Sequence, residues 1–325
     1  MITSILSKEG VFAGWPANHS LHQWDNEILV GYVAGDHHAD ERLTHNVLGQ
    51  LYFLQSRSFD YGKTWSEPEP TQIPEKFRTT DLLEYKDDPK KDIFRIRGNY
   101  DHGGDYLDPS TGFYASSDKG KTWRGPFAFK GLTFDYETYE NSSRTCVVNE
   151  VFYLTRKKAR YWASDSVIPC ILRDGVFEIQ NTLILERPYR TAMPSVVSTP
   201  NGVFMAVRTK KFPTRFHNGI EIFKLQDNSW VSIRHTFTGN NNGNPPSLFY
   251  KNGELHLFYG NRKKRKILHE KTSDFNTWTS SVIYEAASDD FGYCQSFDAA
   301  EKGIGIIFYE DKPEHKRSEI NCIFV

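Results

Sequence analysis

The sequence predicts an all-β fold, a six-bladed β-propeller with four antiparallel strands in each blade. Three observations predict it: an eight-residue motif that occurs twice, three weaker copies of that motif, and pairs of short apolar runs joined by polar turns. The copies recur at a period of about 50 residues, and four antiparallel strands at such a period are typical of a propeller blade.

The eight-residue motif reads SFDYGKTW at Ser58–Trp65 and SSDKGKTW at Ser116–Trp123. We expect it to form a hairpin turn, because Asp60 and Asp118 can accept hydrogen bonds from backbone N–H groups of the turn. The glycine two positions after each aspartate supplies the positive φ that such a turn requires. Each copy therefore predicts the connection between the third and fourth strands of a blade.

Three degenerate copies keep the aspartate and end in an aromatic residue: RDGVF at Arg173–Phe177, QDNSW at Gln226–Trp230 and TSDFNTW at Thr272–Trp278. The terminal aromatic residues of the five copies follow one another at intervals of 58, 54, 53 and 48 residues. A sixth unit fits if residues near Ile2–Leu6 supply its outer strand. That strand would join both ends of the chain in one sheet and remove exposed sheet edges. The spacing therefore predicts six blades in one domain, residues 1–325.

Each period also contains two apolar runs separated by a short polar turn. The turn residues are Pro-Asn-Gly, Lys-Asn-Gly, Glu-Lys-Gly and Trp-Asp-Asn, which suit the left-handed backbone of a hairpin. The paired runs are Ser195–Arg208, Ser247–Gly260, Ser296–Tyr309 and Ser20–Tyr32. They predict the inner and second strands of four blades.

Composition excludes several classes of protein. The 40 basic and 41 acidic residues give a net charge of −1, which argues against a nucleic-acid or membrane-surface partner. No apolar run approaches the roughly 20 residues that cross a bilayer. The start, MITSILSKEG, lacks the features of a signal peptide, so we expect a cytoplasmic protein unless a signal segment precedes it. The four cysteines lack metal-like spacing and predict buried, reduced thiols. No cofactor and no metal are predicted.

The motif S-x-D-x-G-x-T-W resembles the Asp-box, or BNR repeat, of the sialidase (neuraminidase) superfamily. This resemblance implies a six-bladed catalytic propeller whose boxes lie on the outer rim and hold the blades together. It also implies an active site at the centre of the ring, where inner strands begin and second strands end. The chain is most similar to a sialidase-like group that shares four segments, here Gly14–Asn18, Met193–Ser195, Asn244–Pro246 and Gly292–Tyr293.

The inner strands are predicted to start at Ala17–Leu21, Arg78–Leu83, Ser142–Val148, Ala192–Val197, Gly243–Leu248 and Gly292–Phe297. Arginines recur near the ends of the predicted second strands, at Arg97, Arg156, Arg208 and Arg262, and near inner-strand starts, at Arg144 and Arg190. Guanidinium groups placed there can bind a carboxylate or sulfate with two parallel hydrogen bonds. We predict that Arg97, Arg144, Arg190, Arg208 and Arg262 bind an anionic substrate. The alternative is that they bridge blades or meet acidic side chains.

A sialidase resemblance implies three arginines on the substrate carboxylate, a tyrosine paired with a glutamate as nucleophile, and an aspartate as acid/base. The segment GYCQSF resembles the last-blade segment that carries the nucleophile, which implies Tyr293. The first-blade Arg-Ile-Pro element is absent, and WPANHSL, with Asn18 and His19, replaces it. An imidazole there can act as acid or base near neutral pH, or form a hydrogen bond across the channel.

Weaker candidates complete the predicted site. The amide of Asn244 is expected to hold sugar hydroxyls, Glu137 or Glu140 to serve Tyr293, and His102 to reach the substrate. The segment DHHAD at Asp36–Asp40 is interpreted as a solvated loop rather than a metal site.

These residues predict a glycoside hydrolase, a sialidase-like exo-glycosidase that removes a terminal acidic sugar in an arginine-lined central cleft. Two alternatives stay open. One is a polysaccharide lyase that acts next to a uronate, with His19 or Tyr293 as base. The other is a glycan-binding propeller without catalysis.

Overall fold

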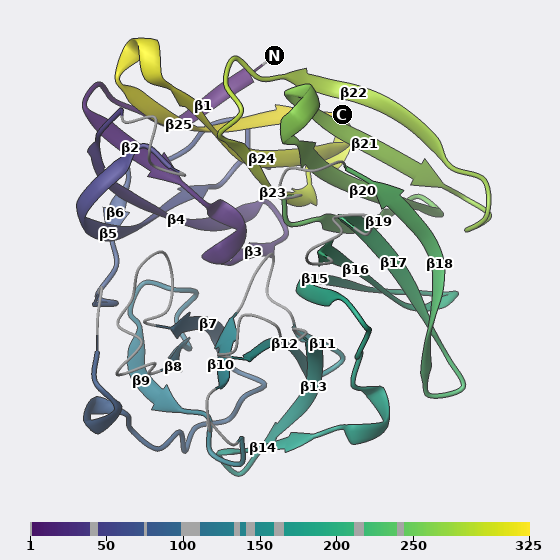
Figure 1. Cartoon of the computed structure of the whole chain (residues 1–325). Helices are drawn as coiled ribbons and strands as arrows, with labels where there is room; N and C mark the ends of the chain where they lie inside the picture. Colours follow the sequence, from purple (N-terminus) through teal and green to yellow (C-terminus); the bar gives the residue numbers. More distant parts are fainter. Residues whose placement is uncertain are drawn as a thin grey trace.

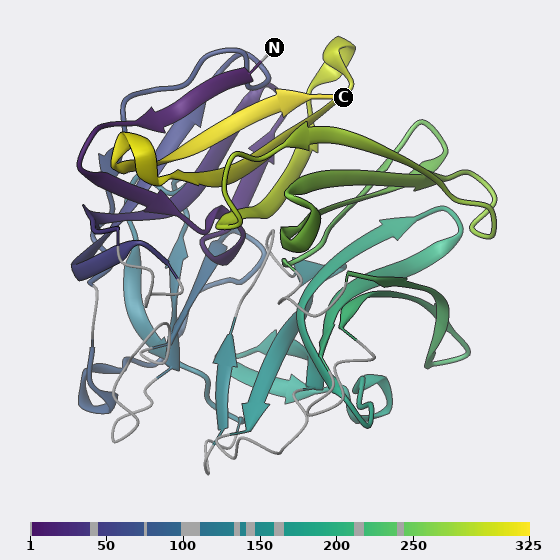
Figure 2. The same ribbon diagram turned by 45° about the horizontal axis from the view of Figure 1, so that its top comes forward.

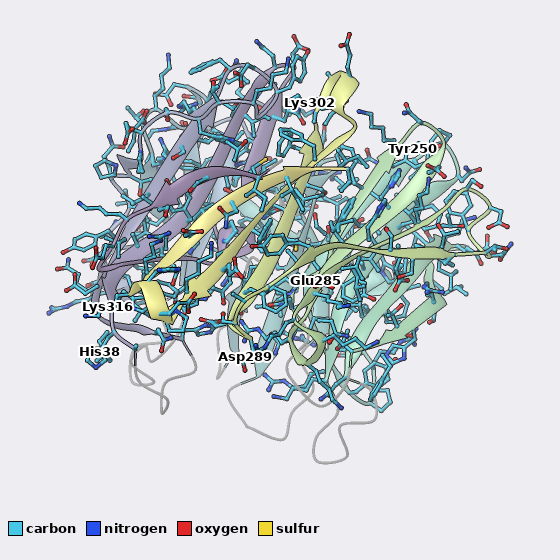
Figure 3. The ribbon with its side chains drawn as sticks, turned by 90° about the horizontal axis from the view of Figure 1, so that it is seen from above. His38, Tyr250, Glu285, Asp289, Lys302 and Lys316 are labelled. Atoms are coloured by element: carbon cyan, nitrogen blue, oxygen red, sulfur yellow. The ribbon has the colours of Figure 1, made fainter. Side chains whose placement is uncertain are left out.

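The computed structural model describes residues 2–39, 45–74, 77–98, 111–132, 137–140, 147–158, 166–210, 218–238 and 244–325. Six antiparallel sheets surround a central axis, and the part of the chain that is described contains no α-helix (Figure 1). The prediction of an all-β, six-bladed β-propeller is confirmed. Figure 3 shows Asp289 and His38 at one end of this axis and Lys302 and Tyr250 at the other.

The first three blades contain β2 to β14. Blade 1 has β2 (Val11–Gly14) and β3 (Leu21–Trp24) side by side on β4 (Glu27–His37), followed by β5 (Val47–Ser58) and β6 (Glu69–Pro70). Blade 2 has β7 (Ile93–Gly98), β8 (Thr111–Ser116) and β9 (Arg124–Ala128) among the described residues. Blade 3 has β10 (Glu137–Glu140) and β11 (Val147–Val148) on β12 (Val151–Lys158), followed by β13 (Ser166–Arg173) and β14 (Val176–Ile179).

Blades 4 and 5 follow the four-strand order without interruption. Blade 4 has β15 (Arg190–Thr199), β16 (Gly202–Lys210), β17 (Gly219–Gln226) and β18 (Ser229–Phe237). Blade 5 has β19 (Ser247–Lys251), β20 (Glu254–Asn261), β21 (Lys266–Thr272) and β22 (Thr279–Glu285).

Blade 6 joins the two ends of the chain. It contains β23 (Phe291–Asp298), β24 (Ile304–Lys312), β25 (Arg317–Phe324) and β1 (Ile2–Ser7). Strand β1 pairs antiparallel with β25, from Ile2 opposite Ile323 to Ser7 opposite Glu319 (Figure 2). The predicted closure of the ring by the N-terminal strand is confirmed.

The repeated motif forms the predicted turn. Thr64 N–H donates to Asp60 Oδ1 at 2.9 Å, and Thr122 N–H donates to Asp118 Oδ1 at 2.9 Å. Gly62 has a φ of +81° and Gly120 a φ of +76°, as the turn requires. The first turn connects β5 to β6, the third and fourth strands of blade 1, and the second connects β8 to β9, the last two strands described in blade 2.

One predicted start of an inner strand is wrong. In blade 2, Thr79–Asp81 form a 3-10 turn, and Leu83 bridges Phe127 of the outermost strand β9. Asp81 Oδ2 accepts the N–H of Arg78 at 2.7 Å, so local capping overrides the apolar pattern. In blade 1 the predicted inner strand is present as β3, which begins at Leu21 and pairs with β4. A second inner segment, β2, begins earlier, at Val11, and the turn η1 (Pro16–Asn18) separates the two. Pro16 has no N–H to donate to a strand ladder.

The core lies between neighbouring blades. One apolar cluster joins blades 1, 2 and 6 through side chains that include Phe12, Tyr114 and Phe297. Cys170, Cys294 and Cys322 are buried free thiols, as predicted, and Cys146 lies outside the described residues. None of the described helices is long and apolar enough to cross a membrane.

Candidate active site

The inner strands of blades 1, 4 and 6 are interrupted a few residues after they begin. In blade 1 the interruption is the turn η1. In blade 4 it is a bulge of β15 between Ala192 and Ser195, and in blade 6 it is a bulge of β23 between Gly292 and Gln295. A non-glycine residue with positive φ lies at each interruption: Trp15 (+55°), Met193 (+59°) and Tyr293 (+54°). Such conformations cost about 1–3 kcal/mol each and gather at functional sites, as β-bulges do. Three of the four segments that the sequence shares with the sialidase-like group therefore coincide with backbone strain.

Three side chains, from blades 1, 5 and 6, meet at Asp290, which precedes β23. Its Oδ1 accepts a hydrogen bond from the Tyr309 hydroxyl at 2.5 Å and from Arg262 Nη2 at 3.0 Å, and lies 2.9 Å from His45 Nδ1. Arg262 Nη2 also donates to the Tyr309 oxygen at 2.9 Å. Asp290, His45 and Tyr309 are buried. We call these four residues the Asp290 cluster.

Burial and neighbouring charges set the protonation states of Asp290 and Tyr309. Burial alone would raise the pKa of Asp290, but the hydrogen bond from His45 and the charge of Arg262 lower it. Burial and the neighbouring carboxylate raise the pKa of Tyr309 well above its ordinary value. Asp290 is therefore ionised and Tyr309 neutral at neutral pH. The ionised carboxylate of Asp290 therefore orients His45, Arg262 and Tyr309 and is a poor proton donor.

Tyr293 lies beside the Asp290 cluster. Its ring packs edge-on against that of Tyr309, with centroids 5.7 Å apart, and its side chain is 6% exposed. Tyr309, against which Tyr293 packs, also accepts a hydrogen bond from Arg262 Nη2. The structure thus brings together two residues, Tyr293 and Arg262, that the sequence predicted separately.

Asn18 and His19 lie on the segment that faces β23. Gln295 Nε2 donates to the backbone oxygens of Pro16 and Ala17 at 3.4 and 3.3 Å, which joins η1 to β23. The ring of His19 packs against Phe53, with centroids 5.3 Å apart. Asn18 Oδ1 is buried without a hydrogen bond. The segments of His19 and Tyr293 are therefore adjacent, and a direct contact of their side chains stays a prediction.

The amide of Asn244 lies between the backbones of two neighbouring blades. A Cβ at Gly260 of β20 or at Gly292 of β23 would overlap its Nδ2 atom, so both positions require glycine. Asn244 is 1% exposed, and neither its Nδ2 nor its Oδ1 makes a hydrogen bond. Arg262 Nε and Asp290 Oδ2 are also buried without a hydrogen bond. A buried polar group left unpaired costs about 1–3 kcal/mol, so each one requires an explanation.

The other predicted arginines have different surroundings. Arg208 Nη1 contacts Met193 Sδ at 3.6 Å. Arg190 begins β15, where its backbone lies opposite that of Lys210 in β16. Arg156 Nη2 donates to Glu186 at 2.7 Å, and Arg262 bonds Asp290, so these two follow the alternative of acidic partners. Backbone alone is described for Arg97, Glu137 and Glu140, and Arg144 and His102 lie outside the described residues.

Sequence reasoning missed Asp290, His45 and Tyr309. Asp290 directly precedes the segment that carries Tyr293, which is the one local signal for it. The interpretation of DHHAD as a solvated loop is wrong for its first two residues: Asp36 and His37 end β4, the His37 side chain is 1% exposed, and its Nε2 lies 2.8 Å from Asp311 Oδ1. Among the described residues no group of three or more His, Cys, Asp or Glu side chains is arranged to hold a metal.

Comparisons with known proteins found similar structures. No protein-family model and no curated protein matches the sequence. A protein of unknown function from Dyadobacter fermentans DSM 18053 is 19% identical, with 99% of this chain and 97% of that chain covered and a TM-score of 0.72. A Hadza microbial sialidase is 14% identical over 97% of this chain and 65% of its own, with a TM-score of 0.63.

An α-L-arabinofuranosidase from Fusarium graminearum is 13% identical over 98% of this chain and 97% of its own, with a TM-score of 0.58. At these identities the likenesses establish the shared propeller fold. The chains that share it include glycoside hydrolases.

Proposed function

We propose that this protein is a glycoside hydrolase, a sialidase-like exo-glycosidase that removes a terminal acidic sugar. The observation that supports this most is the group of buried polar atoms without hydrogen bonds near the start of β23. They belong to Asn18, Asn244, Arg262 and Asp290. Amide, guanidinium and carboxylate groups are those that hold the hydroxyls and carboxylate of a sugar. The glycoside hydrolases among the structural neighbours support the same class of activity.

In this proposal Tyr293 and His19 carry the chemistry. A phenol at its ordinary pKa of about 10 is a weak nucleophile and requires a base or a nearby cation. Arg262 supplies the positive charge beside Tyr293, and His19 supplies a group that transfers protons near neutral pH. Arg190 and Arg208, with Arg97 and Arg144, bind the substrate carboxylate, and Asn18 and Asn244 bind its hydroxyls. Asp290 stays ionised and holds Arg262 and Tyr309 in place.

A second candidate is a polysaccharide lyase that acts next to a uronate. The three contacts on Asp290 Oδ1 favour it. They leave the phenol of Tyr293 and the imidazole of His19, rather than a protonated carboxylic acid, to transfer protons. The base removes the proton α to the uronate carboxylate, the oxygen of the glycosidic bond leaves with its electron pair, and a carbon–carbon double bond forms.

One screen separates these functions. Acidic oligosaccharides are incubated with the protein, and new reducing ends and the ultraviolet absorbance of unsaturated uronates are both recorded. Reducing ends without absorbance support the hydrolase, and reducing ends with absorbance support the lyase. Tyr293→Phe, which keeps the ring, should abolish either signal. Binding of an oligosaccharide without turnover would overturn both and leave a glycan-binding propeller.

A further inference from the structure

Arg95 is a buried guanidinium with no acidic partner among the described residues. It lies in β7, is 4% exposed, and reaches the interface between blades 2 and 1. Its Cζ lies 4.6 Å above the ring of Trp123, the last residue of the second motif copy. No acidic side chain in the described part of the chain pairs with it, and its Nη2 makes no hydrogen bond. Burial, and then the charge of Arg57, lower the pKa of Arg95 to about 9.

Arg95 contacts the turn that carries Asn18 and His19. Its Nε donates to Ser20 Oγ at 3.3 Å, and Ser20 Oγ donates to the backbone oxygen of His19 at 2.5 Å. Gly31 of β4 lies behind this contact and donates its N–H to the backbone oxygen of Ser20 at 3.1 Å. A Cβ at Gly31 would overlap both Arg95 Nη2 and the His19 oxygen. The absent side chain of Gly31 thus makes room for the guanidinium and the turn together.

The free-energy cost of burying the Arg95 cation indicates that Arg95 does more than fill space. Ser20 has a φ of +67°, and Trp15, at the other end of the turn, has a φ of +55°. These conformations persist only where the surroundings enforce them. Burying a cation without a counter-charge costs several kcal/mol, and an apolar side chain of similar volume often packs there at lower cost. The contact with Trp123 offsets part of that cost.

We propose that Arg95 is a positioning residue of the proposed site: it holds the Asn18–Ser20 turn against Gly31 and so fixes where Asn18 and His19 lie. This inference rests on the proposed function for the roles of Asn18 and His19. It also links the repeated motif to the site, because Trp123 supports the guanidinium that supports the turn.

The first test measures the turn itself and requires no substrate. Arg95→Met keeps the approximate volume and removes the charge and the Nε donor. Arg57→Met is the matched control, because Arg57 is buried in the same interface but bonds Glu27. We expect the Asn18 and His19 amides, which donate to Trp15 and Pro16, to exchange hydrogen at least tenfold faster in Arg95→Met and at the wild-type rate in Arg57→Met. The unfolding midpoint of Arg95→Met should not fall.

Unchanged exchange in Arg95→Met, or equal acceleration in Arg57→Met, would overturn the inference. If Arg95→Met does not fold, Ser20→Ala removes the same link and should accelerate exchange at the same two amides; exchange at the wild-type rate there would also overturn it.

The second test uses the oligosaccharide found in the screen. Arg95→Met should lower kcat at least tenfold, Arg57→Met should leave it unchanged, and Arg95→Lys should restore only part of the loss, because lysine keeps the charge but not the Nε donor. Wild-type kcat in Arg95→Met would count against a positioning role. If the wild-type protein turns over no oligosaccharide, the proposed function fails, and hydrogen exchange alone decides whether Arg95 fixes the turn.

Discussion

Arg262 and Asp290 join two blades at the candidate site. Nη2 of Arg262, which follows the second strand of blade 5, donates to Oδ1 of Asp290, which precedes the inner strand of blade 6, at 3.0 Å. Both side chains are largely buried, at 12% and 11% exposed. The ion pair therefore holds the start of β23, and with it Tyr293, against the neighbouring blade.

Removal of Arg262 should destabilise the protein strongly. Arg262→Met leaves Asp290 buried without its cation, which costs about 3–5 kcal/mol in comparable buried pairs. Denaturant unfolding of the variant measures the loss in free energy. Arg265→Gln is the control, because Arg265 is exposed and its side chain donates to the backbone oxygen of Ala287. Equal midpoints for Arg262→Met and Arg265→Gln would contradict this role of the pair.

Acid should weaken the pairing of β1 with β25, which closes the ring. Burial alone would raise the pKa of Glu319, but hydrogen bonds from Lys312, Ser7 and Arg317 outweigh it and lower the pKa to about 2. Because the folded-state pKa lies below the unfolded-state value of about 4.3, the stabilisation is complete above that value and is lost as the pH falls toward 2. Glu319→Gln should flatten the fall of the unfolding midpoint over this window. An unchanged slope would contradict the role of the Glu319 carboxylate.

The fold was predictable because the repeated turn rests on local chemistry. Asp60 bonds the amide of Thr64 four residues later, so a short stretch of sequence contains the whole interaction, and its spacing counts the blades. The same local chemistry misled the assignment in blade 2. Asp81 caps a turn at Arg78, and the apolar residue Leu83 joins the outer edge of the blade instead of its centre.

The site was predictable only where one residue type recurs at one position of the blade. The recurrence predicted Arg262, which bonds Asp290, and a resemblance predicted Tyr293; their roles toward a substrate stay predictions. The Asp290 cluster depends on contacts between distant residues: His45 and Asp290 are 245 positions apart, and nothing near either one indicates the other. Tyr309 lies in the apolar run IGIIFY and reads as a core residue. Arg95 has no recurring counterpart in sequence, and its role depends on an absent side chain at Gly31.

Deletion of residues 1–8 should expose the edge of β25 and cause aggregation. Strand β1 covers this edge and buries Ile5 against the core that joins blades 1, 2 and 6. An unpaired strand edge pairs readily with another chain. Light scattering and size-exclusion chromatography measure the outcome. Ile2→Lys serves as the control, because Ile2 is 53% exposed and its substitution keeps the strand. A soluble monomeric truncation with a wild-type unfolding midpoint would show that closure does not depend on β1.

The last prediction concerns His19 and Tyr293 as a pair. Gln295 joins their segments through the backbone oxygens of Pro16 and Ala17, so we expect one substrate at the start of β23 to contact both side chains. His19→Ala and Tyr293→Phe should each lower kcat by about 10² or more, the usual contribution of a positioned proton-transfer group. Because Tyr293→Phe keeps the ring packed on Tyr309, its loss reports the hydroxyl alone. Groups that act as a unit are non-additive, so the double variant should lose little beyond either single one. If the two losses multiply instead, His19 and Tyr293 act in separate steps, and the base that serves Tyr293 has to be sought among the carboxylates.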